Sequence, residues 1–244
     1  MTQTKLSVPF KFLLFLLLFA LIAGVFSYIS MRYGNAEEAM QEEHTHAKFT
    51  VILDAGHGGE DGGAVSASGL YEKDLNLAVA CLVRDMLEAN GVEVVMTRET
   101  DVLLYDRNTD YEGRKKALDL AARRKIGEET PDSIFVSIHM NAYPQAQYSG
   151  LQVWYSPNNA QSQVIAEEIQ ATVSRSLQPE NDRRVKSATS SIYLLHHLTS
   201  PAVLVECGFL SNPAEAEKLN TPEYQKELAF LIFLSIMQAQ SGNG

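Results

Sequence analysis

The stretch that decides the fold occupies residues 49–59 and reads FTVILDAGHGG. Its first five residues are apolar or β-branched, which is typical of a strand buried within a parallel sheet. An aspartate, a histidine and several glycines follow at once, so polar side chains stand where this strand ends. The glycines form neither a Gly-x-Gly-x-x-Gly nor a Gly-Lys-Ser/Thr pattern. They therefore indicate close approach of the backbone to a metal or substrate rather than phosphate binding.

Outward from this stretch, the chain alternates between strand and helix patterns. The predicted strands are 49–53, 92–97, 134–138, 150–155 and 202–205, and the predicted helices are 72–90, 111–128, 159–177 and 222–240. This alternation predicts an α/β fold: a single domain whose mostly parallel sheet has helices on both faces. The strand at 150–155 follows its predecessor too closely for a helical crossover, so we expect it to be antiparallel to its neighbour.

Composition excludes several classes of protein. The 244 residues are 45% apolar and 20% charged, as in an ordinary globular protein. The residues after position 34 include 17 basic and 30 acidic side chains, a net charge of −13. Such an acidic body is unsuited to nucleic acid, whose binding depends on neutralising phosphates. Two cysteines, Cys81 and Cys207, cannot form a disulfide framework. Their apolar surroundings predict inert buried thiols, and a single bridge between them is the alternative.

The N-terminal segment is predicted to be a targeting segment rather than part of the folded domain. Residues 12–31 contain no charge and are long enough to span a bilayer, and Lys5 and Lys11 precede them. We predict a membrane anchor over residues 1–34; a cleaved signal peptide is the alternative, with a weak cleavage site at Val25-Phe26-Ser27. Either places the remainder on the outer face of the membrane. Residues 35–48 read as a polar linker, and the catalytic domain is predicted at 49–244.

Polar residues gather where the predicted strands end. His57 follows the first strand, His139 the third and Glu206 the last, while Glu72 opens the first helix. The carboxyl ends of parallel strands share one edge of the sheet, so we expect these side chains to meet there. Two histidines and a carboxylate suit zinc with one position open for water, and a second carboxylate could then act as general base.

Each of these residues also has a purely structural interpretation. A histidine at a strand end is often only hydrogen-bonded, and Glu72 could serve as an acidic residue at a helix N-terminus. Glu206 is harder to explain in this way, because an unpaired charge within an apolar run is costly. A buried ion pair with an arginine is the structural alternative for Glu206.

Four motifs give the chain a specific resemblance. They are VILDAGHGG with DGGA at 51–64, EKD at 72–74, SIHMNA at 137–142 and VECGFLSN at 205–212. In this order they resemble the zinc-dependent N-acetylmuramoyl-L-alanine amidases of the Amidase_3 family, from about residue 49 to residue 239. The resemblance implies that His57, Glu72 and His139 are zinc ligands and that Glu206 is the catalytic glutamate. Thr97, Arg98 and Arg123 match positions that support the structure or the substrate.

The resemblance implies hydrolysis of the amide between N-acetylmuramic acid and the L-alanine of the peptidoglycan stem peptide. Glu206 would take a proton from water and return it to the leaving nitrogen. The N-terminal segment, the compact domain and the lack of wall-binding repeats are similar to the germination-specific amidases of spore formers. A role in spore-cortex maturation through muramic-δ-lactam, and in germination, is therefore expected.

Peptidoglycan and the membrane are the expected partners, with catalysis on the outer face of the cytoplasmic membrane, in a spore former within the forespore envelope. Only Tyr143 to Ser149 separate Ala142 from Gly150, which leaves no room for a helix covering the zinc. Control of the activity must therefore come from elsewhere, and a sporulation-specific activating protein is one candidate. The rival interpretations are a zinc peptidase that cuts within the stem peptide and a peptidoglycan-binding module without catalysis.

Overall fold

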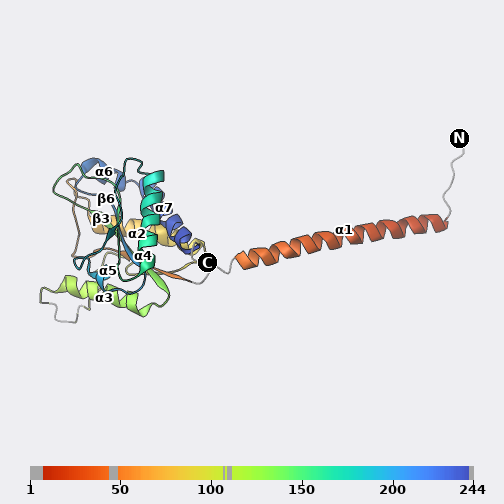
Figure 1. Cartoon of the computed structure of the whole chain (residues 1–244), viewed down its shortest axis with the longest axis horizontal. Coiled ribbons are helices and arrows are strands. Elements are labelled where there is room, and N and C mark those ends of the chain that lie inside the picture. The colour runs from red at the N-terminus through yellow and green to blue at the C-terminus, as the bar shows by residue number, and fades with distance from the viewer. Residues whose placement is uncertain (1–7, 44–48, 107, 109–111, 242–244) are drawn as a thin grey trace. The chain divides into compact units, whose positions relative to one another are not determined.

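The computed structural model describes residues 8–43, 49–106, 108 and 112–241. Its contacts divide the chain into two compact units, residues 1–48 and residues 49–244. The first unit contains the long helix α1 (Val8–Glu43), which includes the apolar segment and continues through positions 35–43 of the predicted linker (Figure 1). The rest of that predicted linker, residues 44–48, lies outside the described residues.

Within its own unit, α1 exposes large apolar side chains. Phe19 and Phe26, for example, are 64% and 72% exposed. Among the residues that the structure describes, however, no helix has both the length and the apolar character needed to cross a membrane. The anchor predicted for residues 1–34 is not supported by the structure and stays a prediction.

The second unit is built on a six-stranded sheet with the order β2-β1-β3-β6-β4-β5. Its strands are β1 (Thr50–Ala55), β2 (Glu93–Met96), β3 (Ser133–Asn141), β4 (Gln152–Tyr155), β5 (Lys186–Ser187) and β6 (Ala202–Phe209). The strands β2, β1, β3 and β6 are parallel, and β4 is antiparallel to β6. The predicted mostly parallel sheet and the predicted reversal of β4 are confirmed. The neighbour of β4 is β6, which lies between β4 and β3.

Helices cover both faces of this sheet, as the alternation predicts (Figure 1). On one face, α2 (Glu72–Ala89), α4 (Ala160–Ser176) and α7 (Pro222–Ser241) enclose the main core with residues such as Val51, Ile138 and Val205. On the other, α3 (Lys115–Glu129) and α5 (Tyr193–His197) cover a smaller core that includes Phe135 and Leu204. Because side chains alternate along a strand, His139 and Glu206 project toward the α3 face.

Two strands that carry site residues are longer than predicted. β3 extends from the predicted 134–138 to Asn141, and β6 extends from the predicted 202–205 to Phe209. In the parallel register His139 lies opposite Glu206. The polar residues therefore sit inside the strand ends rather than after them, because pairing between the two strands continues past their apolar parts.

Other differences concern short elements. β5, α5 and α6 (Pro213–Leu219) have between two and seven residues, too few to show a periodicity in the sequence. α3 begins at Lys115, whereas the prediction started at residue 111, which lies outside the described residues. Both cysteines are free thiols, but only Cys207 is buried and Cys81 is partly exposed.

Candidate metal centre and active site

Three side chains from different elements meet at the carboxyl edge of the sheet. His57 follows β1, Glu72 is the first residue of α2, and His139 lies near the end of β3. Oε1 of Glu72 lies 3.2 Å from Nε2 of His57 and 2.9 Å from Nδ1 of His139. One ligand atom from each residue lies within 4.8 Å of the other two. The three residues that the sequence places at one edge are thus close enough to bind a single metal ion.

Glycines make room for these side chains. A Cβ atom at Gly56 would overlap the imidazole of His139. At Gly63, where φ is +67°, a Cβ atom would overlap Oε2 of Glu72 and the ring of His57. A side chain at either position would displace His139, or Glu72 and His57, from their places in the candidate metal centre. The glycine-rich loop therefore serves close packing around the candidate metal centre, in agreement with the interpretation of the sequence.

Hydrogen bonds fix the carboxylate of Glu72, which is buried. Its Oε2 accepts a bond of 2.7 Å from the backbone N–H of Ala64, and its Oε1 accepts one of 3.2 Å from that of Met140. Burial alone would raise the pKa of Glu72, but hydrogen bonds to His139 and His57 hold this pKa well below its usual range. Glu72 is therefore an ionised acceptor aimed at both histidines. Its position at the start of α2 is not merely that of a helix-terminal acid.

Asp61, which stands in the motif DGGA and for which no role is predicted from the sequence, also belongs to this site. Its Oδ2 lies 2.9 Å from Nδ1 of His57, the ring nitrogen opposite the one that faces Glu72. The backbones of Gly58 and Asp61 bond to each other, and this turn brings Asp61 back over the ring. Such a carboxylate keeps the proton on Nδ1 and leaves Nε2 free to bind a metal. The sequence signal for this contact is that Asp61 follows His57 by four residues, across a turn that contains Gly58 and Gly59.

Glu206 lies on the strand next to His139 and faces the same cleft. Its Oε2 is buried and has no hydrogen-bond partner within the described part of the chain. Burial raises the pKa of Glu206 to about 7, despite the opposing effect of His139. The structural alternative of an ion pair with an arginine does not hold, because the buried Arg123 pairs with Asp54 and Asp119 instead. An unsatisfied carboxylate beside three potential metal ligands suits a general base.

Two arginines hold the loop that carries His57. Arg123 is buried; it donates to Asp54 at 2.6 Å and to the carbonyl oxygen of His57 at 2.7 Å. Arg98 donates to the carbonyl oxygens of Ala55, at 2.8 Å, and Gly56, at 3.0 Å. His57 has a φ of +61°, a left-handed conformation that a non-glycine residue adopts only when its surroundings hold it there. The arginines thus support the structure of the site.

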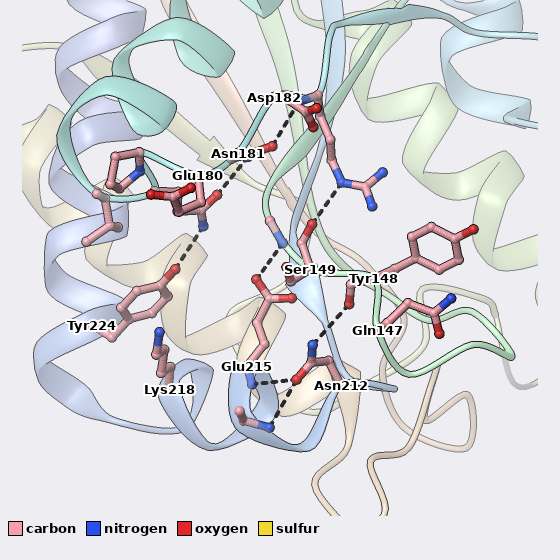
Figure 2. A pocket seen from close by; sticks show the side chains of 16 residues that line it. Gln147, Tyr148, Ser149, Glu180, Asn181, Asp182, Asn212, Glu215, Lys218 and Tyr224 are labelled. Atoms are coloured by element: carbon pink, nitrogen blue, oxygen red, sulfur yellow. Dashed lines mark hydrogen bonds between the residues drawn. The ribbon is translucent and has the colours of Figure 1, made fainter.

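Two cavities lie in this region of the protein. A cavity of about 240 Å³ is lined by His57, His139 and Glu206, together with Lys116 and Tyr193. A larger one, of about 500 Å³, is lined by residues 147–150, 177–183 and parts of α6 and α7 (Figure 2). The larger cavity contains none of His57, Glu72, His139 and Glu206, and most of its amide side chains already bond to the protein. The smaller cavity is therefore the candidate active site.

Comparison with known proteins agrees with this geometry. The family model described as N-acetylmuramoyl-L-alanine amidase, Amidase_3, matches residues 51–238. The chain belongs to this amidase family. The matched region begins in β1 and ends in α7, so it includes every element that positions the site.

Individual relatives of this amidase are similar over most of its length. The germination-specific N-acetylmuramoyl-L-alanine amidase of Bacillus subtilis is 39% identical over 228 residues, which are 93% of this chain and 94% of that protein. The amidase LytC of the same species is 32% identical over 182 residues, 74% of this chain and 33% of LytC. The CwlD amidase from Clostridioides difficile, solved in complex with the GerS lipoprotein, is 38% identical with a TM-score of 0.75, covering 79% of this chain and 98% of that one.

Proposed function

We propose that His57, Glu72 and His139 bind one zinc ion and that Glu206 is the general base for hydrolysis of the N-acetylmuramoyl-L-alanine amide. The observation that carries this proposal is the approach of three ligand atoms to one another beside the unpartnered Oε2 of Glu206. Two imidazoles and one carboxylate are a donor set that zinc prefers at catalytic sites, with a fourth position open. Membership of the amidase family supports the same substrate class.

The residues around the candidate centre have distinct tasks in this proposal. A bound zinc ion supplies a Lewis acid that polarises the lactyl carbonyl and acidifies water. Glu206 accepts a proton from the attacking water and donates it to the nitrogen of L-alanine, which is a poor leaving group without that proton. Asp61 keeps the proton of His57 on Nδ1, and Arg123 holds the carbonyl of His57, so both preserve the orientation of this ligand.

The products of digestion test this function. Purified protein acting on peptidoglycan should release peptides with a new amino-terminal L-alanine, whereas a peptidase would cut within the stem peptide. Release of peptides lacking that L-alanine would refute the amidase activity. If no peptide is released from well-hydrated peptidoglycan in the presence of zinc, the result would favour a peptidoglycan-binding module without catalysis.

Two substitutions test the site residues. His139→Ala should lose most of the bound zinc. The control His197→Ala removes a histidine whose Nδ1 is bonded to the carbonyl oxygen of Tyr193, and it should retain the zinc. Glu206→Gln should retain zinc and lose turnover by about 10²- to 10⁴-fold, while Glu128→Gln, in an exposed ion pair on α3, should not. Zinc content and rate are measured on the same samples. Undiminished zinc in His139→Ala or undiminished turnover in Glu206→Gln would reject the assignment.

The finer biological role is also a proposal. Similarity to the germination-specific amidase of Bacillus subtilis supports a role in cortex maturation, through muramic-δ-lactam, and in germination. The C. difficile relative in complex with a lipoprotein supports an activating partner of the same kind for this chain. The peptidoglycan substrate supports action outside the cytoplasm, with residues 1–34 as anchor or signal and 49–244 as the catalytic domain. Muropeptide analysis of spores lacking this chain tests the cortex role.

A further inference from the structure

Exposed apolar side chains of the second unit gather on loops at the carboxyl edge of the sheet. Within residues 49–241 as the structure describes them, the large apolar side chains that are exposed are Val65, Tyr71, Tyr143, Tyr148, Val164 and Phe230. The first four lie on the loops that follow β1, the strand before His57, and β3, the strand that contains His139, whereas the last two lie on helices. Apolar side chains exposed together often mark a binding surface.

Tyr143 and Tyr148 form a pair on the loop after β3. Their ring centroids are 5.1 Å apart with an angle of 86° between the planes, and the side chains are 51% and 40% exposed. Behind Tyr148 lie the ring of Phe209, at 6.3 Å between centroids, and the guanidinium of Arg183, at 5.8 Å. The pair is thus packed against Phe209 and Arg183 on one side and exposed to solvent on the other. We call Tyr143 and Tyr148 the tyrosine pair.

The loop that carries the tyrosine pair is fastened at both ends. The N–H of Tyr143 donates to Oγ of Ser211 at 3.0 Å. Nδ2 of Asn212 donates to the carbonyl of Tyr148 at 3.3 Å, and the N–H of Gly150 donates to the buried carboxylate of Glu215 at 2.8 Å (Figure 2). In Figure 2 the ring of Tyr148 lies apart from this cluster. The rings are therefore held in place before a ligand arrives, which lowers the entropic cost of binding.

The chemistry around the pair indicates the ligand. Between His139 and Glu167 the chain has no Asp, Glu, Lys or Arg, although the protein carries a net charge of −10. The loop instead supplies tyrosine rings, amides and a hydroxyl. Sugar rings present apolar C–H faces that stack on aromatic rings, and N-acetylated sugars are neutral, whereas the stem peptide carries carboxylates. One charged group, the guanidinium of Arg183, lies behind Tyr148 and donates its Nε hydrogen to the carbonyl oxygen of Ser149. The loop itself adds no charge, so its exposed rings and amides suit the glycan better than the peptide.

We infer that the tyrosine pair is a binding subsite for an N-acetylhexosamine ring of the glycan strand, at the same sheet edge as the candidate metal centre. The inference rests on the proposed function for its substrate, a polymer whose repeating sugars extend beyond the bond that is cut. Binding energy at this subsite would hold the strand while the amide lies at His57, His139 and Glu206.

Titration of the full chain with chitotetraose, a soluble tetramer of N-acetylglucosamine, tests the inference. Tyr143→Ala and Tyr148→Ala should each weaken binding about 3- to 10-fold, the range expected for one aromatic stacking contact. Tyr143→Phe and Tyr148→Phe should retain most of the affinity, because stacking uses the ring. Phe230→Ala, which removes an equally exposed aromatic ring from α7, should leave the affinity unchanged. NMR chemical shifts follow binding, and thermal unfolding confirms that each variant is folded.

Several outcomes would overturn the inference: unchanged affinity in both alanine variants, an equal loss in Phe230→Ala, or weakened binding of the tripeptide L-Ala-γ-D-Glu-diaminopimelate in place of the sugar. Chitotetraose contains no scissile amide, so the titration does not depend on hydrolysis. Sugar binding through the tyrosine pair without amidase activity would refute the proposed function alone. Amidase activity with unchanged sugar binding in the variants would refute the inference alone.

Discussion

The carboxylate of Glu206 suits a general base, but its buried Oε2 lowers the stability of the folded protein when the group is charged. Its residue lies in β6 beside His139, and no described group hydrogen-bonds to this oxygen. A buried carboxylate without a partner favours its protonated form, because charge is poorly solvated there. The ionised carboxylate of Glu206 therefore destabilises the folded state, and a nearby cation or a water molecule would reduce this penalty.

The stability of the metal-free protein should depend on pH through this residue. Burial raises the pKa of Glu206 to about 7 in the folded chain, against an ordinary value of 4.5. The folded state holds this proton more tightly than the unfolded state, so stability present below pH 4.5 is lost as the pH rises through 7. We expect metal-free Glu206→Gln to exceed the wild type in stability at about pH 8, by up to about 3 kcal/mol.

Urea unfolding in the presence of a chelator measures this difference. Near pH 4.5 both proteins carry a neutral side chain at position 206, so their stabilities should converge. A difference that is the same at both pH values would show that Glu206 is not held in its protonated form.

A second prediction at this scale concerns Asp61. Removing its contact with Nδ1 of His57 should lower zinc affinity about 10- to 100-fold, the usual cost of losing the partner of a metal-binding histidine. Asp61→Ala is compared with Asp101→Asn, since Asp101 bonds to the backbone of Gly59 in the same loop without touching a ligand. Competition with a chromophoric chelator gives the affinities. An equal loss in both variants would attribute the effect to the loop rather than to the histidine.

At the scale of elements, the site depends on how loops are fastened between strands and helices. The loop from Tyr143 to Ser149 is bonded to Ser211 and Asn212, which precede α6, and its neighbour Gly150 is bonded to Glu215 within α6. None of its residues lines the cavity that contains His57 and His139. The short loop therefore stands beside the candidate site without covering it.

Replacing residues 143–149 by a short glycine linker should consequently not activate the enzyme. We expect activity on purified peptidoglycan, with zinc in excess, to stay level or to fall, because no cover is removed and the tyrosine pair is lost. Rates for the wild type and the variant at equal zinc occupancy provide the measurement. A large gain in activity would show that this loop occludes the site.

At the scale of the whole molecule, two units with different surfaces are joined in one chain. The helix α1 exposes apolar side chains, whereas the chain after residue 34 is strongly acidic. An acidic surface is repelled by anionic lipid headgroups. Attachment to a membrane would therefore have to come from the N-terminal segment rather than from the surface of the catalytic unit.

Fractionation of cells decides between the two predictions made for that segment. An uncleaved anchor should leave the mature protein in the membrane fraction after washing with high salt, because apolar burial does not weaken with ionic strength. Deletion of residues 1–34 with a substitute signal peptide should release it. A mature soluble protein that begins near Tyr28 would show instead that the segment is a cleaved signal.

Local patterns along the chain are enough to predict the class of the fold and the members of the candidate metal centre. Strand and helix patterns depend on neighbours along the chain, and parallel strands bring their carboxyl ends to one edge, so His57, His139 and Glu206 could be placed together without coordinates. The glycines beside them could likewise be explained by close packing. Short elements such as β5 and α5 escaped prediction, because a few residues show no periodicity.

The contacts that hold these residues in place could not be predicted from the sequence. The bond from Asp61 to His57, the ion pairs of Arg123 and the carboxylate of Glu215 beneath Gly150 join residues whose pairing no local pattern specifies. The insertion of β6 between β3 and β4 likewise follows from packing across the whole sheet. These contacts depend on distance in space rather than on spacing in the chain, which is why only the folded molecule shows them.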